Sequence, residues 1–157
     1  LAEARAKASG LDMVYLATAT AGDKEMSSRI AHHRQRRGTD WHLVEEPVAL
    51  AAALRSHHGE ERCVVVDCLT LWLSNCLHEE CWESESAALL DTLPELSGHV
   101  ILVSNETGLG VVPMGELTRR FVDESGFLHQ RTAQLCQQVT LTVAGLPVSL
   151  KSSETLR

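Results

Sequence analysis

The stretch of the chain with the most chemically useful residues is 103–113, which reads VSNETGLGVVP. An apolar run over residues 99–103 predicts a buried strand, and the polar pair Asn105 and Glu106 follows it, ahead of two glycines and a proline. Ligands of open α/β sheets bind at the carboxyl ends of strands. A carboxylate and an amide at such an end could hold a metal ion, a phosphate or a hydroxyl. Asn, Gly and Pro are also ordinary turn residues, so a plain strand-ending turn is the alternative.

A second candidate is the basic segment 29–37, RIAHHRQRR, in a predicted helix. Met26, Ile30 and His33 share one stripe of that helix, whereas His32 points about 100° away. A neutral imidazole can attack phosphorus, and its reference pKa of about 6.5 leaves it mostly neutral in the cytoplasm. Neighbouring guanidinium groups would neutralise phosphate charge. The alternative is structural, since cations near a helix C-terminus also complement the helix dipole.

A third candidate is Asp67, which ends the apolar run 64–66. An acidic residue after a buried strand is the Walker-B pattern, in which it holds magnesium, directly or through water, beside nucleotide phosphates. Strands also end in aspartate for capping reasons, so the pattern gains meaning only together with the other two candidates.

The elements that must position these residues alternate between strands and helices. We expect strands over residues 12–17, 41–45, 62–66, 99–104, 139–143 and 147–150. We expect helices over 1–8, 23–37, 48–57, 69–78, 83–96 and 116–137, the last with an irregularity at Gly126. This alternation favours an α/β fold with a mostly parallel sheet and helices on both faces. The pattern predicts a single domain over residues 1–151 and a loose polar tail over 152–157.

Composition excludes several classes of protein. The 157 residues carry a formal net charge of −7, which argues against nucleic acid as the main partner. No apolar run approaches the roughly 20 residues of a membrane span, and no signal peptide is visible, so we expect a cytoplasmic protein. The five cysteines form no C-x-x-C pair and are predicted to be reduced thiols rather than metal ligands.

Taken together and in this order, the three candidates resemble the bifunctional adenosylcobinamide kinase/adenosylcobinamide-phosphate guanylyltransferase family of cobalamin biosynthesis. The resemblance runs from residue 1 to about residue 151. It covers YLATA at 15–19, the double-histidine segment, Trp41 with Glu45, DCLTLWLSN at 67–75 and NETGLGVVP at 105–113. It implies a P-loop NTPase-like α/β fold related to RecA. It also implies phosphorylation of adenosylcobinamide with ATP or GTP, then transfer of GMP from GTP to adenosylcobinamide phosphate through a GMP–histidine intermediate, which yields adenosylcobinamide-GDP.

The resemblance also implies roles for individual residues. His33 would be the residue that carries GMP, which agrees with its place on the helical stripe. Asp67 would lie near the metal and the phosphates, with Mg²⁺ arriving with GTP or ATP and no tightly bound cofactor. Asn105 and Glu106 match the family's signature but receive no role. The residues implied to contact the nucleotide are Ala17, Thr18, Ala19, Arg34, Gln35, Arg36, Arg37, Glu45 and Asp67.

The sequence departs from the family pattern at its start. The family begins with a strand and a Walker A loop, G-G-x-R-S-G-K-S, which does not occur in these 157 residues. Residues 1–6 resemble the helix after that loop, so we expect the native enzyme to have the loop and the polypeptide as written to lack kinase activity. The resemblance suggests a homo-oligomer, a trimer. Two other functions stay open: a different P-loop nucleotide kinase or NTPase without a covalent histidine, and a catalytically inactive GTP-binding module.

Overall fold

The structure, a computed structural model, describes residues 1–20 and 40–152. They form two compact units, one spanning Ala2–Glu106 and the other Leu1 together with Thr107–Arg157. The predicted helix of residues 23–37, which carries both neighbouring histidines, lies outside the described residues.

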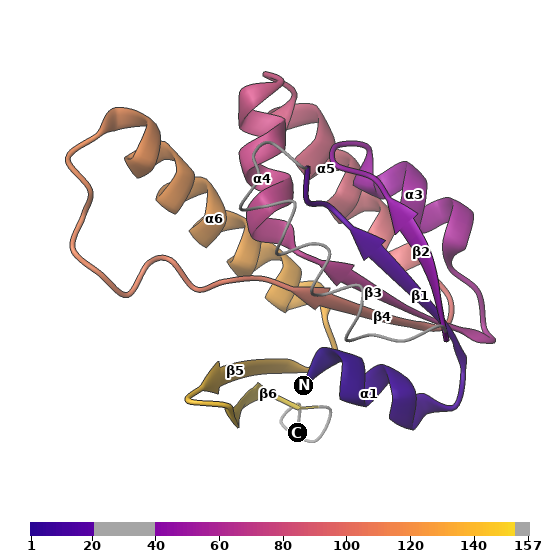
Figure 1. The fold of residues 1–157 in the computed structure, drawn as a ribbon. Coiled ribbons are helices and arrows are strands. Elements are labelled where there is room, and N and C mark those ends of the chain that lie inside the picture. The colour runs from indigo at the N-terminus through magenta and orange to yellow at the C-terminus, as the bar shows by residue number, and fades with distance from the viewer. Residues whose placement is uncertain (21–39, 153–157) are drawn as a thin grey trace. The chain divides into compact units, whose positions relative to one another are not determined.

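The first unit is built on a sheet of four parallel strands in the order β2-β1-β3-β4 (Figure 1). The sequence predicted all four to within one residue at each end, because each is a short apolar run bounded by turn residues. This sheet confirms the predicted α/β class. The strands are β1 (Asp12–Ala17), β2 (Trp41–Glu45), β3 (Arg62–Asp67) and β4 (His99–Val103).

Helices cover both faces of this sheet, as predicted (Figure 1). On one face, Ala6 of α1 (Ala2–Ser9) packs against Tyr15, Cys63 and Val65. On the other face, the fully buried side chains of Leu50, Leu54 and Trp72 belong to α3 and α4. The helices of this second face are α3 (Leu50–His57), α4 (Leu69–His78) and α5 (Trp82–Thr92).

Two predicted helix boundaries in the first unit are wrong by more than one residue. The helix after Pro47 begins at Leu50 rather than at residue 48, because Glu46 Oε1 accepts the N–H groups of Val48 at 2.9 Å and of Ala49 at 2.8 Å. This holds the residues after Pro47 in a separate turn. The helix predicted to reach residue 96 ends as α5 at Thr92, and a 3-10 turn, η1 (Leu93–Glu95), follows. Pro94 lacks the N–H that an α-helix would need there.

The second unit contains α6 (Glu116–Leu135) and the antiparallel strands β5 (Val139–Val143) and β6 (Leu146–Lys151). Helix α6 runs through Gly126 without a break, so the predicted irregularity is wrong. The helix ends two residues earlier than predicted, where Lys151 Nζ donates to the Ala133 and Gln134 carbonyls. In the part of the chain that the structure describes, no helix is long and apolar enough to cross a membrane.

Candidate functional site

The carboxyl ends of the four parallel strands bring predicted site residues into one row. Ala17 at the end of β1 pairs in register with Glu45 at the end of β2 and with Asp67 at the end of β3. Asp67 pairs in turn with Val103, and residues 104–106 follow. Neighbouring strands lie about 4.8 Å apart, so Glu45 and Asp67 are separated by about 10 Å across Ala17. One nucleotide can reach all three positions of this row, which we call the carboxyl row.

The orientation of Asp67 is set by a residue to which the sequence assigned no role. The Tyr15 hydroxyl donates a hydrogen bond to Asp67 Oδ2. Tyr15 is only 3% exposed, and its ring packs edge-on against Trp41 with the ring centroids 5.6 Å apart. Within the described part of the chain, Asp67 Oδ1 has no hydrogen-bond partner. The buried phenol therefore holds one carboxylate oxygen and leaves the other for a ligand.

Thr18, the residue that follows β1, joins the ends of β1 and β3. Its side chain is fully buried. The hydroxyl donates to the Cys68 carbonyl at 2.8 Å and accepts the Cys68 N–H at 2.9 Å, while the Thr18 N–H donates to the Asp67 carbonyl at 3.1 Å. The predicted contact of Thr18 with nucleotide, like that of the partly buried Ala19, remains a prediction, because the Thr18 hydroxyl is already committed to Cys68.

Two residues of the 67–75 segment hold the same edge from α4. The Asn75 amide donates to the Thr18 carbonyl at 2.8 Å and to the Pro47 carbonyl at 3.0 Å. The Trp72 indole N–H donates to the Val48 carbonyl at 2.7 Å. Trp72 and Asn75 thus hold the two loops that follow β1 and β2. Within the 67–75 motif, their role is to position the backbone at this edge of the sheet.

Thr70 performs the same task for the loop after β4. Its hydroxyl lies 3.3 Å from the Ser104 hydroxyl and accepts the Asn105 N–H at 2.8 Å. Asn105 and Glu106 are exposed beyond the end of β4. The pair that first indicated a site therefore lies next to the carboxyl row, held there by its backbone.

The sequence missed Tyr15, Thr70 and Asn75 as positioning residues. Alternation along a strand places Tyr15 and Ala17 on one face, which the sequence alone can show. Only the parallel pairing of β1 with β3 puts Asp67 on that face next to Tyr15.

Thiol chemistry is not a strong candidate at this edge. Burial raises the pKa of the Cys68 thiol above its ordinary value. The thiolate is the reactive form, so Cys68 is a poor nucleophile beside Asp67. All five cysteines are free, as predicted.

His33 and the predicted nucleotide contacts Arg34, Gln35, Arg36 and Arg37 lie outside the described residues. Their place relative to the carboxyl row stays a prediction.

Comparison with known proteins shows the family to which the chain belongs. The sequence profile of a family described as cobinamide kinase / cobinamide phosphate guanyltransferase matches residues 1–150. The chain belongs to this family. Membership assigns it both activities of the family, phosphorylation of cobinamide and guanylyl transfer to cobinamide phosphate. The match spans both compact units.

Three curated relatives agree with this assignment. A Pseudomonas aeruginosa protein named bifunctional adenosylcobalamin biosynthesis protein CobP is 59% identical over 154 residues, which cover 96% of this chain and 89% of the relative. Proteins named bifunctional adenosylcobalamin biosynthesis protein CobU are 30% identical in Escherichia coli and 28% identical in Salmonella typhimurium. Each of these two matches covers 88% of this chain and 86% of the relative.

Proposed function

We propose that this enzyme phosphorylates adenosylcobinamide with ATP or GTP and then moves GMP from GTP onto the product through a covalent GMP–His33 intermediate. The observation that carries the proposal is the carboxyl row, which gathers Ala17, Glu45 and Asp67 at the edge of a parallel sheet. The family resemblance implies nucleotide contacts for all three residues. Ligands of such sheets bind at this edge.

The proposed guanylyl transfer takes place in two displacements at the same phosphorus. A neutral His33 ring nitrogen attacks the α-phosphorus of GTP, a P–N bond forms, and pyrophosphate leaves. A phosphate oxygen of adenosylcobinamide phosphate then attacks that phosphorus, the P–N bond breaks, and neutral His33 is regenerated. Covalent catalysis of this kind splits one difficult transfer into two easier ones. Arg34, Arg36 and Arg37 would neutralise the charge that develops on the phosphate oxygens.

Asp67 fits the part of a magnesium-site residue. Magnesium in nucleotide sites is held by one or two carboxylates together with waters and phosphates. Among the described residues no three His, Cys, Asp or Glu side chains gather as a metal cage, and Asp67 offers Oδ1 at the carboxyl row. When bound, the ion would neutralise the charge of the triphosphate. Asp67 would orient it or its waters, and Tyr15 would hold Asp67.

The Tyr15→Phe variant tests this chain of contacts. Removal of the hydroxyl leaves the buried ring in place but frees Asp67 Oδ2, so the carboxylate loses its fixed orientation. We expect magnesium-dependent GTP binding to weaken about 10-fold, the usual effect of losing a residue that orients a metal ligand. Calorimetric titration with GTP measures this. GTP binding in the presence of EDTA serves as the control and should not change. Equal affinity of the variant and the parent in magnesium would contradict the role given to Tyr15.

The covalent step is tested by the intact mass of the protein before and after incubation with GTP and magnesium. The proposal predicts an added mass equal to GMP, which acid removes because phosphorus–nitrogen bonds to imidazole are acid-labile. A protein that hydrolyses GTP but never gains this mass would be an ordinary nucleotide kinase or NTPase. A protein that binds GTP without turnover or adduct would be a binding module.

We also propose that the enzyme is a homotrimer. The family resemblance suggests the number three, and self-association is supported by the second unit, where Leu109, Val111 and Met114 are 82%, 95% and 96% exposed in one short segment. Contiguous exposed apolar side chains of this kind mark interaction surfaces. Light scattering measures the subunit number, and a monomeric mass would contradict the proposal.

A further inference from the structure

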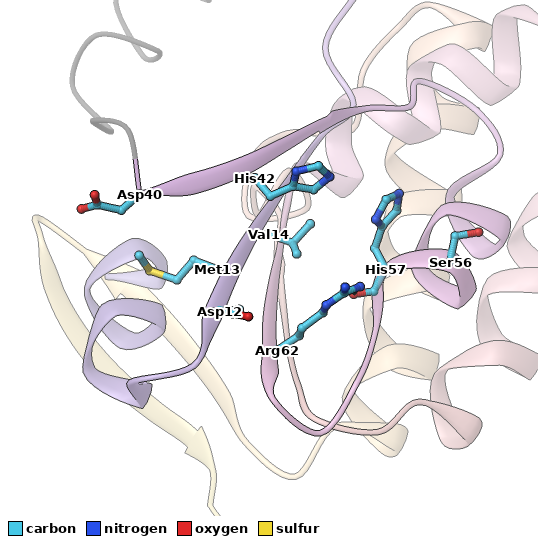
Figure 2. Close-up of a pocket in the computed structure, with 8 residues that line it drawn as sticks. All are labelled: Asp12, Met13, Val14, Asp40, His42, Ser56, His57 and Arg62. Atoms are coloured by element: carbon cyan, nitrogen blue, oxygen red, sulfur yellow. The ribbon is translucent and has the colours of Figure 1, made fainter.

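A cavity of about 440 Å³ lies at the other end of the first unit's sheet (Figure 2). It is bounded by the amino-terminal ends of the strands, with Asp12 of β1, His42 of β2 and Arg62 of β3, and by Ser56 and His57 at the end of α3. Strands β1 and β3 are six residues long, which separates their two ends by about 16 Å. The cavity is therefore a different place from the carboxyl row.

Three nitrogen-bearing side chains meet in this cavity. The rings of His42 and His57 have their centroids 5.6 Å apart. The Arg62 side chain extends toward His57, and its Nη1 donates to the His57 carbonyl at 3.3 Å (Figure 2). Within the residues that the structure describes, Arg62 has no ion pair with a carboxylate. Since a guanidinium carries five N–H donors, most of those of Arg62 are left for a ligand.

Arg62 places a positive charge beside His57. Burial lowers the pKa of His57, and the nearby His42 and Arg62 lower it further. Asp12 and Asp40 also line the cavity, but neither is among the groups that shift the His57 pKa, and the Asp40 carboxylate points away from the two rings (Figure 2). Glu60 and Glu61, in the connection from α3 to β3, do not line the cavity. Among the described residues no third metal-ligating side chain joins the two imidazoles, so the arrangement suits an anion better than a metal ion.

We propose that this cavity binds the phosphate group of a small molecule, with Arg62, His42 and His57 donating hydrogen bonds to its oxygens. Arginine matches the geometry of phosphate oxygens through its planar fork of donors. The volume falls in the range of about 300–1,000 Å³ typical of small-ligand sites and exceeds what inorganic phosphate needs, so it has room for a phosphate ester. The site neither depends on the proposed covalent chemistry nor shares residues with it.

We expect the affinity of this cavity for an anion to depend on pH through His57. With no anion bound, the folded chain holds the His57 proton less tightly than the unfolded chain, so this residue lowers stability as the pH falls through about 6.5. A bound dianion reverses this by favouring protonated His57. Affinity for sulfate, which keeps its charge across this range, should therefore rise from about pH 8 to about pH 6.

The test is an NMR titration of the histidine ring resonances with inorganic phosphate and, separately, with ribose 5-phosphate, at fixed ionic strength. We expect the signals of His42 and His57, assigned with the His42→Gln and His57→Gln variants, to move and saturate. Arg62→Gln should weaken binding about 10-fold or more, because a charged bidentate donor is lost. Arg55→Gln is the matched control, since Arg55 lies on α3 two residues before His57 but does not line the cavity, and this variant should bind like the parent.

The two ligands distinguish the sources of the phosphate group. Tighter binding of ribose 5-phosphate supports a phosphate ester as the ligand, and equal affinities support free phosphate. Absence of saturable shifts with both ligands overturns the proposal, as does an unchanged affinity in Arg62→Gln. Arg62 is exposed, so this variant should keep the fold, which the remaining resonances report directly.

Discussion

Replacing His33 with alanine is expected to abolish the covalent GMP adduct and to reduce guanylyl transfer by about three orders of magnitude or more, as removal of a covalent nucleophile usually does. The reason is that, in the proposed mechanism, His33 is the residue that carries GMP from GTP to adenosylcobinamide phosphate. Intact mass after incubation with GTP and magnesium measures the adduct. Transfer to adenosylcobinamide phosphate measures the activity.

The adjacent histidine provides a matched control. His32→Ala removes an identical side chain that points about 100° away on the predicted helix, so this variant should still form the adduct. Because attack requires a neutral imidazole, the rate of adduct formation should also fall as the pH drops below about 6.5. An adduct on His33→Ala, or its loss only in His32→Ala, would show that His33 does not carry GMP.

Replacing Thr18 with valine is expected to lower the free energy of unfolding by about 1–3 kcal/mol. Valine has nearly the same shape but leaves the buried Cys68 N–H without its acceptor, whereas the Cys68 carbonyl still accepts the Trp72 N–H at 3.1 Å. An unsatisfied buried donor costs about 1–3 kcal/mol. Because Cys68 follows Asp67, GTP binding should weaken as well. Urea denaturation measures the stability, and calorimetry measures the binding.

Thr20→Val is the control for this variant, because Thr20 is an exposed threonine two residues away in the same loop. A surface substitution of this kind is usually within about 0.5 kcal/mol of the parent. Equal stabilities of the two variants would mean that the hydrogen bonds between Thr18 and Cys68 contribute nothing to the fold.

Local sequence patterns determined the strands, the fold class and the family of this protein. Each strand of the sheet is a short apolar run with turn residues at its ends, and such a run can be recognised without knowing its neighbours. Asp67 was placed at the end of a strand for the same reason. The family motifs are also local, since each lies within about a dozen residues. The predicted helix bounds were wrong near Glu46, whose carboxylate accepts the N–H groups ahead of α3, and near Pro94, which lacks an N–H of its own.

Only the tertiary structure decided which residues touch. Tyr15 meets Asp67 across 52 residues of chain, Thr18 meets Cys68 across 50, and Asn75 meets Thr18 across 57. The cavity of His42, His57 and Arg62 likewise joins two strands and a helix. A local sequence pattern cannot predict these contacts. They depend on which strands lie next to one another and on the register in which those strands pair.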